Sequence, residues 1–408
     1  MRSLLFALLT AHAITYAQSN WPQFGGPHRD FTIAPGELPS AWPEQGPKTL
    51  WKRPLGDGYS SIAVEGGVLY TMYQKHDDED DVIAIDSKTG KTLWEHPLSR
   101  KTSHRSDYSQ GPGPHSTPLL VNGRVFAINT VGHLVALEPK TGATIWEIDL
   151  WEKYGGVLDR GWSASPIAWK DLVIVPIGGS GKAVMAFRQK DGSVAWQRGD
   201  SKSTFSSPFL IQIGGVTQLV VFCGDEVAAF NPDNGDTQWG YPHKTDYNLN
   251  ISLPTYASGD GIMVLSSAYG GGSRGLQLTW TGSKTEVKEL WAQKKLRLHH
   301  NNALRMGDVV YASSGDFGPA PLTAVNVRDG KVLWQDRGLG KCSLIGSGDR
   351  ALLLSEDGEL ALADLSPAGM KILSRAQVAE NRAWTAPSVV DGIAYIRDRA
   401  TILAVRIR

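Results

Sequence analysis

Hydroxyl, imidazole, amide and indole side chains recur in short clusters along the chain, each close to the start of an apolar segment. The clusters are Tyr59-Ser60-Ser61, His115-Ser116-Thr117, Trp162-Ser163, Ser206-Ser207, Asn250 with Ser252, His299-His300-Asn301-Asn302, Ser343 and Trp384-Thr385. If the fold brings them together, they form a concave pocket with aromatic walls that suits a polar ligand. The candidate ligand-binding residues are His115, Trp162, His300, Asn301, Asp316 and Trp384.

The same residue types also have purely structural uses. Ser and Asn at strand starts near a solvent-filled channel satisfy backbone groups that have no ladder partner. Neighbouring residues of a strand point to opposite faces, so we expect at most one of His299 and His300 to face inward. This argues against a metal site made by the pair alone. Trp162 and Trp384 could equally be core residues.

Charged clusters elsewhere have two interpretations each. Arg105 and Asp107, and Asp159 and Arg160, lie in two loops that we expect on one face of the molecule, where loops on a rigid scaffold often bind ligands. They could clamp a polar ligand or form surface ion pairs. Residues 76–81, HDDEDD, could bind Ca²⁺, but they lack the spacing and turn Gly of a dedicated calcium loop. A solvated loop between strands is favoured there.

Composition excludes several classes of function. Lys plus Arg and Asp plus Glu both number 41, which gives no electrostatic case for nucleic acid or an anionic membrane surface. There is no CxxCH for covalent haem, and no Ser/His/Asp order, P-loop or paired zinc motif. Cys223 and Cys342 are the only cysteines, and we favour two buried free thiols over a disulfide.

The elements that must position these residues form a repeat. Residues 86–94, DSKTGKTLW, return in varied form at a period of about forty to fifty residues. An Asp or Asn ends an apolar strand, a Gly turns the chain with positive φ, and a Trp on the next strand packs between units. The structural repeat residues are Trp51, Asp86, Gly90, Trp94, Gly142, Trp146, Gly192, Trp196, Gly235, Trp239, Trp291, Gly330 and Trp334.

Counting the repeats predicts the fold class: an all-β, eight-bladed β-propeller of four-stranded antiparallel blades. Opening strands are predicted to begin near Ser60, His115, Trp162, Ser206, Asn250, His300, Cys342 and Trp384, and closing strands to end at Trp94, Trp146, Trp196, Trp239, Trp291, Trp334, Leu373 and Trp51. Residues 48–51, KTLW, lack the earlier strands of their own unit, and residues 384–408 lack a closing strand. Joining the two halves closes the ring and removes exposed sheet edges.

The flanking segments complete the domain plan. Residues 1–17 read as a secretory signal peptide, with one early Arg, a short apolar run and small residues before Gln18. Residues 18–47, rich in Pro and Gly, are predicted to form an extended arm that wraps the surface. Residues 48–408 form the propeller as a single domain. No other apolar run is long enough to span a bilayer, so we expect a monomeric periplasmic or secreted protein.

The pattern A-x-D-x-x-T-G-x-x-x-W in residues 84–94 resembles the repeat of the pyrroloquinoline-quinone (PQQ) β-propeller superfamily, and the resemblance covers the whole mature chain. The N-terminal WPQFGGPHRD, with residues 354–360 and 383–387, resembles a bacterial group of short, exported PQQ-like propellers. Size and blade count are also similar to the propeller subunit of the outer-membrane β-barrel assembly machinery. Quinoprotein alcohol dehydrogenases of the superfamily hold PQQ and Ca²⁺ in the channel against a vicinal Cys-Cys disulfide, which this chain lacks.

Three functional hypotheses follow. The first is a rigid binding or protein-assembly module, without catalysis, whose contact surface for a protein or a small polar ligand is one face or the channel. The second, implied by the resemblance, is a quinoprotein dehydrogenase that uses His115, Asn301 or Asp316 with PQQ and Ca²⁺ to oxidise an alcohol or sugar. The third is a carbohydrate or peptide binder that uses Trp162 and Trp384.

Overall fold

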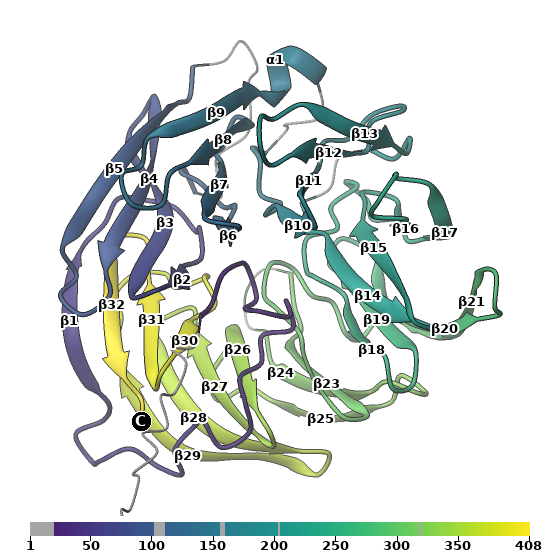
Figure 1. Ribbon diagram of the computed structural model, residues 1–408. Helices are drawn as coiled ribbons and strands as arrows, with labels where there is room; N and C mark the ends of the chain where they lie inside the picture. The colour runs from purple at the N-terminus through teal and green to yellow at the C-terminus, as the bar shows by residue number, and fades with distance from the viewer. Residues whose placement is uncertain (1–19, 102–110, 156–159, 203–204, 317, 319) are drawn as a thin grey trace, which may run out of the picture.

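The computed structural model describes residues 20–101, 111–155, 160–202, 205–316, 318 and 320–408. Within these residues, 32 strands form eight four-stranded antiparallel sheets, arranged as blades around a central axis (Figure 1). The only helix in the described part, α1 (Leu150–Tyr154), follows the second blade and is N-capped by the Asp149 side chain. The predicted eight-bladed β-propeller is confirmed.

Each blade runs from an innermost to an outermost strand. Blade 1 holds β2 (Ala63–Glu65), β3 (Val68–His76), β4 (Glu79–Asp86) and β5 (Thr92–Ser99); blade 2 holds β6 (Leu119–Val121), β7 (Arg124–Ile128), β8 (His133–Leu137) and β9 (Thr144–Asp149); blade 3 holds β10 (Ile167–Trp169), β11 (Leu172–Pro176), β12 (Val184–Arg188) and β13 (Val194–Arg198); blade 4 holds β14 (Phe209–Ile213), β15 (Val216–Phe222), β16 (Glu226–Phe230) and β17 (Thr237–Pro242).

Blade 5 holds β18 (Thr255–Ala257), β19 (Ile262–Ser267), β20 (Gly272–Trp280) and β21 (Thr285–Gln293); blade 6 holds β22 (Leu304–Met306), β23 (Val309–Ser313), β24 (Leu322–Asn326) and β25 (Val332–Asp336); blade 7 holds β26 (Cys342–Ser347), β27 (Arg350–Ser355), β28 (Glu359–Ser366) and β29 (Gly369–Gln377); blade 8 holds β30 (Ser388–Val390), β31 (Ile393–Arg397), β32 (Thr401–Arg406) and, from the other end of the chain, β1 (Lys48–Pro54).

The ring closes between the two ends of the chain, as predicted. β1 pairs antiparallel with β32, with Lys48 opposite Arg406 and Trp51 opposite Ala404 (Figure 1). All eight outermost strands continue at least two residues past the Trp or Leu at which we expected them to end. The pairing therefore gives blade 8 the same four strands as the other blades.

The repeat Trp residues join each blade to the next. The Trp94 indole of blade 1 donates its Nε1–H to the Pro139 carbonyl of blade 2, at 2.8 Å. Its ring lies against Gly142, where an added Cβ would approach Trp94 Cε3 to 2.6 Å, and the φ of Gly142 is +71°. The same relation pairs Gly90 with Trp51, Gly192 with Trp146, Gly235 with Trp196 and Gly330 with Trp291. The repeat motif thus packs blade on blade.

Blade 7 lacks the repeat Trp, and a Trp from the arm takes its place. In the other blades a small residue faces the Trp across the sheet, such as Ala84 opposite Trp94, but in blade 7 Leu362 faces Ser374. The large and small side chains have exchanged strands. The indole that would bridge to blade 8 comes instead from the arm: Trp42 donates its Nε1–H to the Ile407 carbonyl at 3.2 Å, and its backbone N–H to Ser374 Oγ at 3.0 Å.

We expected the arm to wrap the surface of the propeller. Its large side chains are instead buried in the propeller. Trp21 forms a β-bridge with Val64 of blade 1, and Thr32 forms one with Gly346 of blade 7, so residues 21–32 cross the channel (Figure 1). Arg29, buried between them, donates to the carbonyl oxygens of Pro166 and Pro208 in front of blades 3 and 4. The first half of the arm therefore plugs the channel.

The acidic run of residues 76–81 is also different from the expected solvated loop. Its second half starts strand β4, and both Asp80 and Asp81 are buried. Asp80 accepts hydrogen bonds from the backbone and hydroxyl of Thr130 in blade 2, while Asp81 pairs with Lys75 at 3.0 Å. Asp80 therefore links blade 1 to blade 2, and Asp81 links β4 to β3 within blade 1.

Candidate functional site

Apart from Ser343, which lies in β26, the predicted clusters of polar side chains lie in the segments that lead into the innermost strands. Most of these strands begin three to five residues later than expected: β2 starts at Ala63 and not near Ser60, and β22 at Leu304 and not near His300. The clusters are thus connecting segments gathered at one end of the channel. Side chains in such segments are not bound to the alternation of a strand.

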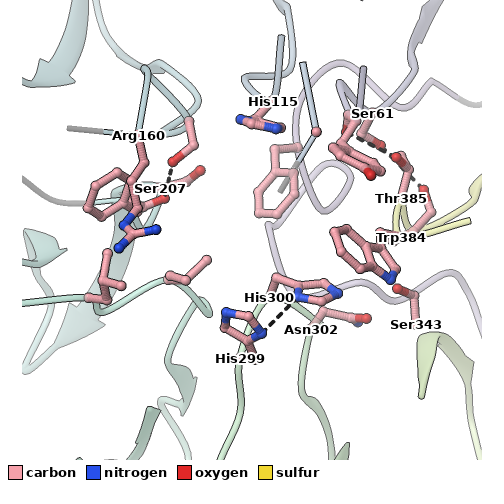
Figure 2. Close-up of a pocket in the computed structure, with 18 of the residues that line it drawn as sticks. Ser61, His115, Arg160, Ser207, His299, His300, Asn302, Ser343, Trp384 and Thr385 are labelled. Carbon is pink, nitrogen blue, oxygen red and sulfur yellow. Dashed lines mark hydrogen bonds between the residues drawn. The ribbon is translucent and has the colours of Figure 1, made fainter. Parts of the chain in front are cut away.

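A pocket of about 210 Å³ lies at this end of the channel. Its walls come from the predicted clusters, among them Tyr59. Figure 2 shows His115, His300 and Trp384 around the cavity, with Arg160 on the opposite side. Phe24 and Phe31, packed edge to face at 5.3 Å between ring centroids, line it from the arm. Because the arm crosses the channel below, these two rings form the pocket floor.

One wall of the pocket is a continuous series of aromatic rings. Tyr59 stacks on His115 at 5.4 Å and on Trp384 at 5.0 Å between centroids, and Trp384 contacts His300 at 4.2 Å. His300 contacts His299 at 4.8 Å. Trp384 is held in place by a hydrogen bond from Nε1 to Glu356, at 2.8 Å. The wall offers a ligand flat, largely apolar surface with fixed geometry.

Both histidines of the adjacent pair line this pocket, so the expectation that only one would face inward is wrong. The physical reason is that residues 299 and 300 precede β22 and are not in a strand. Their Nδ1 atoms lie 3.2 Å apart (Figure 2). No group of three or more His, Cys, Asp or Glu side chains that could hold a metal ion occurs among the described residues.

The hydrogen bonds of the pair assign the protons. His299 Nδ1 lies 3.1 Å from the Asp316 carbonyl oxygen, which can only accept, so Nδ1 carries the proton. His299 Nε2 then accepts from the Tyr269 hydroxyl at 2.7 Å, and His300 Nδ1 accepts a share of the His299 Nδ1–H. The neutral His300 ring therefore carries its proton on Nε2. That atom is buried and has no partner among the described residues.

Burial keeps these imidazoles neutral. It lowers the pKa of His115 to about 4. Burial, with a contribution from the Lys341 ammonium, lowers the pKa of His299 to about 4. Burial and the neighbouring His299 hold the pKa of His300 well below its usual value. At neutral pH the rings are thus flat and uncharged, and the His300 Nε2–H stays buried without a partner among the described residues.

The predicted candidates divide into two groups. His115, His300 and Trp384 line the pocket together. Asp316 stands behind it, where its carbonyl holds both His299 and the Lys341 ammonium. Trp162 and Asn301 are buried and do not belong to the lining residues: the Trp162 ring packs on Gly132 in the core of blades 2 and 3, and the Asn301 carbonyl accepts from Ser252.

Several lining residues were absent from the candidate list. Phe24 and Phe31 come from the arm, which has no periodic pattern, and Tyr269 comes from the turn between β19 and β20 in blade 5. Arg160, one of the predicted loop residues, does line the pocket, whereas Arg105, Asp107 and Asp159 lie outside the described residues. The aromatic floor could be found only from the path of the arm.

Most hydroxyls of the predicted ring serve the scaffold. Ser207 Oγ accepts from the Ser165 backbone N–H at 2.9 Å, and Ser165 Oγ accepts from the Thr117 N–H at the same distance. Thr117 Oγ1 accepts from the Ser61 N–H at 3.2 Å. Each bond crosses from one blade to the next, which satisfies backbone donors that have no ladder partner. The structural interpretation of the serines is thus the one that the contacts support.

The pocket does not fit the PQQ and Ca²⁺ pair. Among the described residues, no Asp or Glu side chain lines it, whereas Ca²⁺ takes oxygen ligands and favours carboxylates. Its volume lies below the roughly 300 Å³ at which small-molecule sites commonly begin. Cys223 and Cys342 are buried free thiols in different blades, and burial raises the pKa of Cys223 to about 12. Neither supplies a disulfide against the cavity.

Comparison with known proteins places the chain in a family. The model for the family described as outer membrane protein assembly factor BamB matches residues 40–111 and 78–336, well over half of the chain. The chain belongs to this family of PQQ-like propellers. The expected resemblance to a PQQ-like propeller is therefore confirmed, and the match extends from the end of the arm through blade 6.

Individual members and neighbours show how far the likeness goes. The outer membrane protein assembly factor BamB of Yersinia pestis is 25% identical over 276 residues, which cover 61% of this chain and 65% of that protein, just under two thirds. The structure of BamB from Moraxella catarrhalis superposes with a TM-score of 0.62 at 16% identity, over 88% of this chain and 97% of that one.

A quinohemoprotein alcohol dehydrogenase from Comamonas testosteroni superposes with a TM-score of 0.67 at 15% identity, over 97% of this chain and 81% of that one. At such identities the superpositions show a shared fold and nothing about chemistry. In the described part of this chain, no helix is long and apolar enough to cross a membrane.

Proposed function

We propose that this propeller is a protein-assembly module of the cell envelope that binds its partner on the face holding the aromatic pocket. The observation that carries the proposal is the pocket itself: a cavity of about 210 Å³ with an aromatic wall and no carboxylate among its described lining residues. Such a cavity suits one anchoring side chain of a partner better than a metal-bound quinone. Deep aromatic pockets of this kind hold the dominant contacts of protein interfaces.

Two further observations support it. The family match, with a relative named as an outer membrane protein assembly factor, favours protein assembly over catalysis. An envelope location agrees with that name and with the secretory signal predicted in residues 1–17. At the pocket, Tyr247 packs edge to face on Tyr269 and is 63% exposed, so it forms an aromatic rim beside the cavity. Exposed Tyr is enriched at protein interfaces.

Site-specific photo-crosslinking in cells that produce the chain tests this function. A crosslinking amino acid in place of Tyr247 should capture an envelope protein that mass spectrometry identifies, and Trp384→Ala in the same chain should reduce the yield at least fivefold. The matched control is the same amino acid in place of Leu93, which is 52% exposed on outer strand β5 and should give no such product.

Cells that lack the chain should also hold less folded outer-membrane protein. Equal capture from positions 247 and 93, with normal levels of outer-membrane proteins, would contradict the assembly role. So would stoichiometric binding of PQQ with Ca²⁺ accompanied by dye-linked alcohol oxidation, because that result assigns the pocket to a dehydrogenase.

A further inference from the structure

The first part of the arm, residues 20–34, forms a loop that enters the channel from the end opposite the pocket. The innermost strands run away from the pocket, so the turns that follow them lie at the other end. Both ends of the loop are held there: the Asn20 side chain accepts from the Gly66 N–H, and the Ala34 carbonyl accepts from Ser347 Oγ. Its middle reaches the pocket floor with Phe24 and Phe31. We call this loop the plug.

Arg29 brings a positive charge into the channel without a carboxylate to balance it. Its buried guanidinium donates to the carbonyl oxygens of Pro166 and Pro208 and to Gln23 Oε1, and it forms no ion pair with another described residue. Burial lowers the pKa of Arg29 to about 9. Removing a charge from water is costly when its partners are neutral, so Arg29 reduces the free energy gained when the plug docks.

Two further features of the plug oppose its docking. Arg29 and Phe31 have φ values of +56° and +59°, a backbone conformation that residues with a Cβ adopt at a cost. The Trp21 indole N–H is buried without a partner among the described residues. Burial of the Trp21 and Phe31 rings, which are 1% and 2% exposed, favours the docked form. Docking therefore depends on a small difference between opposing contributions.

An exposed turn joins the plug to the second half of the arm. Residues 34–36 are exposed, and the Glu37 N–H donates to the Ala34 carbonyl at 3.2 Å. Gly36 has a φ of +83°, and no atom lies within 4 Å of a Cβ added to it. Beyond this turn, Trp42 is bonded to blades 7 and 8. The plug can therefore leave the channel by rotation at the turn while the second half of the arm stays bound.

We propose that residues 20–34 act as a displaceable plug with a docked form, which completes the pocket, and a withdrawn form, in which the pocket opens into the channel. Phe24 and Phe31 leave with the plug, so a ligand that packs on them binds only the docked form. Ligand binding therefore holds the plug in the channel, and withdrawal of the plug releases the ligand. The inference goes beyond the proposed function, because it holds for any occupant that contacts the floor.

Hydrogen exchange of the full chain, resolved to single amides, tests whether the plug moves as a unit. Five backbone N–H groups bond across the boundary between plug and blades: those of Trp21, Ile33, Val64, Leu120 and Gly346. They should share one protection factor, because one opening exposes them all. It should be about tenfold or more below that of the central amides of β3, β7 and β27, strands that are paired on both sides.

A charge reversal in the plug separates its opening from unfolding of the propeller. Arg29→Glu places a carboxylate against the Pro166 and Pro208 carbonyls and should lower the protection of the five amides by about 100-fold. Protection in β3, β7 and β27 should stay unchanged. Arg53→Glu is the matched control: Arg53 also donates to a backbone carbonyl, that of Gly90, but on the outermost strand of blade 8, and the plug should keep its protection.

A small aromatic probe tests the coupling between the pocket and the plug. A cavity of roughly 150 Å³ holds benzene, so p-cresol is a suitable probe for about 210 Å³. At ten times its Kd, measured by calorimetry, p-cresol should slow exchange of the five amides about elevenfold, the factor expected for a ligand of the docked form alone. It should bind Arg29→Glu about tenfold more weakly than the parent chain.

Several results would overturn the inference. One is protection of the five amides equal to that of β3, β7 and β27. Another is an equal loss of protection in plug and blades for Arg29→Glu, because the plug would then be inseparable from the fold. The coupling fails if p-cresol does not bind, binds without slowing exchange, or binds Arg29→Glu as tightly as the parent. None of these measurements involves a protein partner, so they can fail while the assembly function stands.

Discussion

Gly142 meets two separate demands in the turn between β8 and β9. Its φ of +71° is a conformation that residues with a Cβ adopt only with strain, and the space where a Cβ would lie is filled by the Trp94 ring of the preceding blade. The turn and the blade interface therefore require the same residue for different reasons. A glycine that has a positive φ but no neighbouring atom at the Cβ position separates the backbone effect from the packing effect.

Gly181 is that residue, since its φ is +72° but no atom lies within 4 Å of a Cβ added to it. Gly181→Ala should lower the free energy of unfolding by about 1 kcal/mol, from backbone strain alone. Gly142→Ala should cost about 1–3 kcal/mol more, because overpacking against Trp94 is added to the same strain. Urea unfolding of both variants measures the difference. Equal losses would show that the indole gives way freely.

Blade 7 shows how an element can lose its signature residue and keep its interface. The outermost strand of the other blades carries a Trp opposite a small residue. In blade 7, Ser374 on β29 is small and Leu362 on β28 is large, and the arm supplies the missing indole as Trp42. The arm is thus a structural part of blade 7 as well as the plug of the channel.

Trp42→Ala should lower the free energy of unfolding by about 3–5 kcal/mol, the range for a buried Trp, because it removes both the packing and the bond to the Ile407 carbonyl. Trp42→Phe should cost less, since it loses the bond but keeps most of the buried ring. In the Trp42→Ala background, the paired changes Ser374→Trp and Leu362→Ala should restore part of the loss by rebuilding the repeat. Chemical unfolding measures all three, and a loss below 1 kcal/mol for Trp42→Ala would contradict this role.

Features that repeat along the chain could be predicted from the sequence, whereas features that occur only once could not. Blade number, ring closure and the Gly and Trp contacts are repeated many times, so a period reveals them. Trp42, Phe24 and Phe31 occur once each in a segment without a period. The Trp42 partners, Ser374 and Ile407, lie more than 300 residues away in the sequence, and Phe24 and Phe31 pack on each other. The inward orientation of both His299 and His300 was missed because β22 starts four residues after His300, so the rule of alternating faces did not apply.

At the scale of the whole molecule, buried neutral imidazoles link stability to pH. Burial lowers the pKa of His243 to about 4, as it does for His115 and His299. As pH falls, these histidines are protonated near pH 6.5 in the unfolded chain but only near pH 4 in the folded chain. Their contribution to stability is therefore complete above about pH 6.5 and is lost as pH falls toward 4. The raised pKa of Asp81, about 6, acts in the opposite sense.

His243 offers a clean test of this linkage. Its ring nitrogens have no hydrogen-bond partner among the described residues, and its ring packs on Phe222 at 5.1 Å between centroids. His243→Phe should therefore fold, and between pH 6.5 and 4 it should lose about 2–3 kcal/mol less stability than the parent chain. Urea unfolding at a series of pH values measures this. Because Asp81 is common to both chains, parallel pH profiles would contradict the assignment.

The pairing of β1 with β32 also sets the order in which the molecule can be completed. The two strands are separated by roughly 350 residues, which a ribosome adds in about 20–70 s at 5–20 residues per second. Throughout that time β1 has no partner, and blade 8 cannot be completed until β32 has been made. A chain shortened by even the final strand would keep seven complete blades and two open sheet edges that are ready to pair with other chains. The addition of β32 is therefore what turns a growing array of blades into a closed ring.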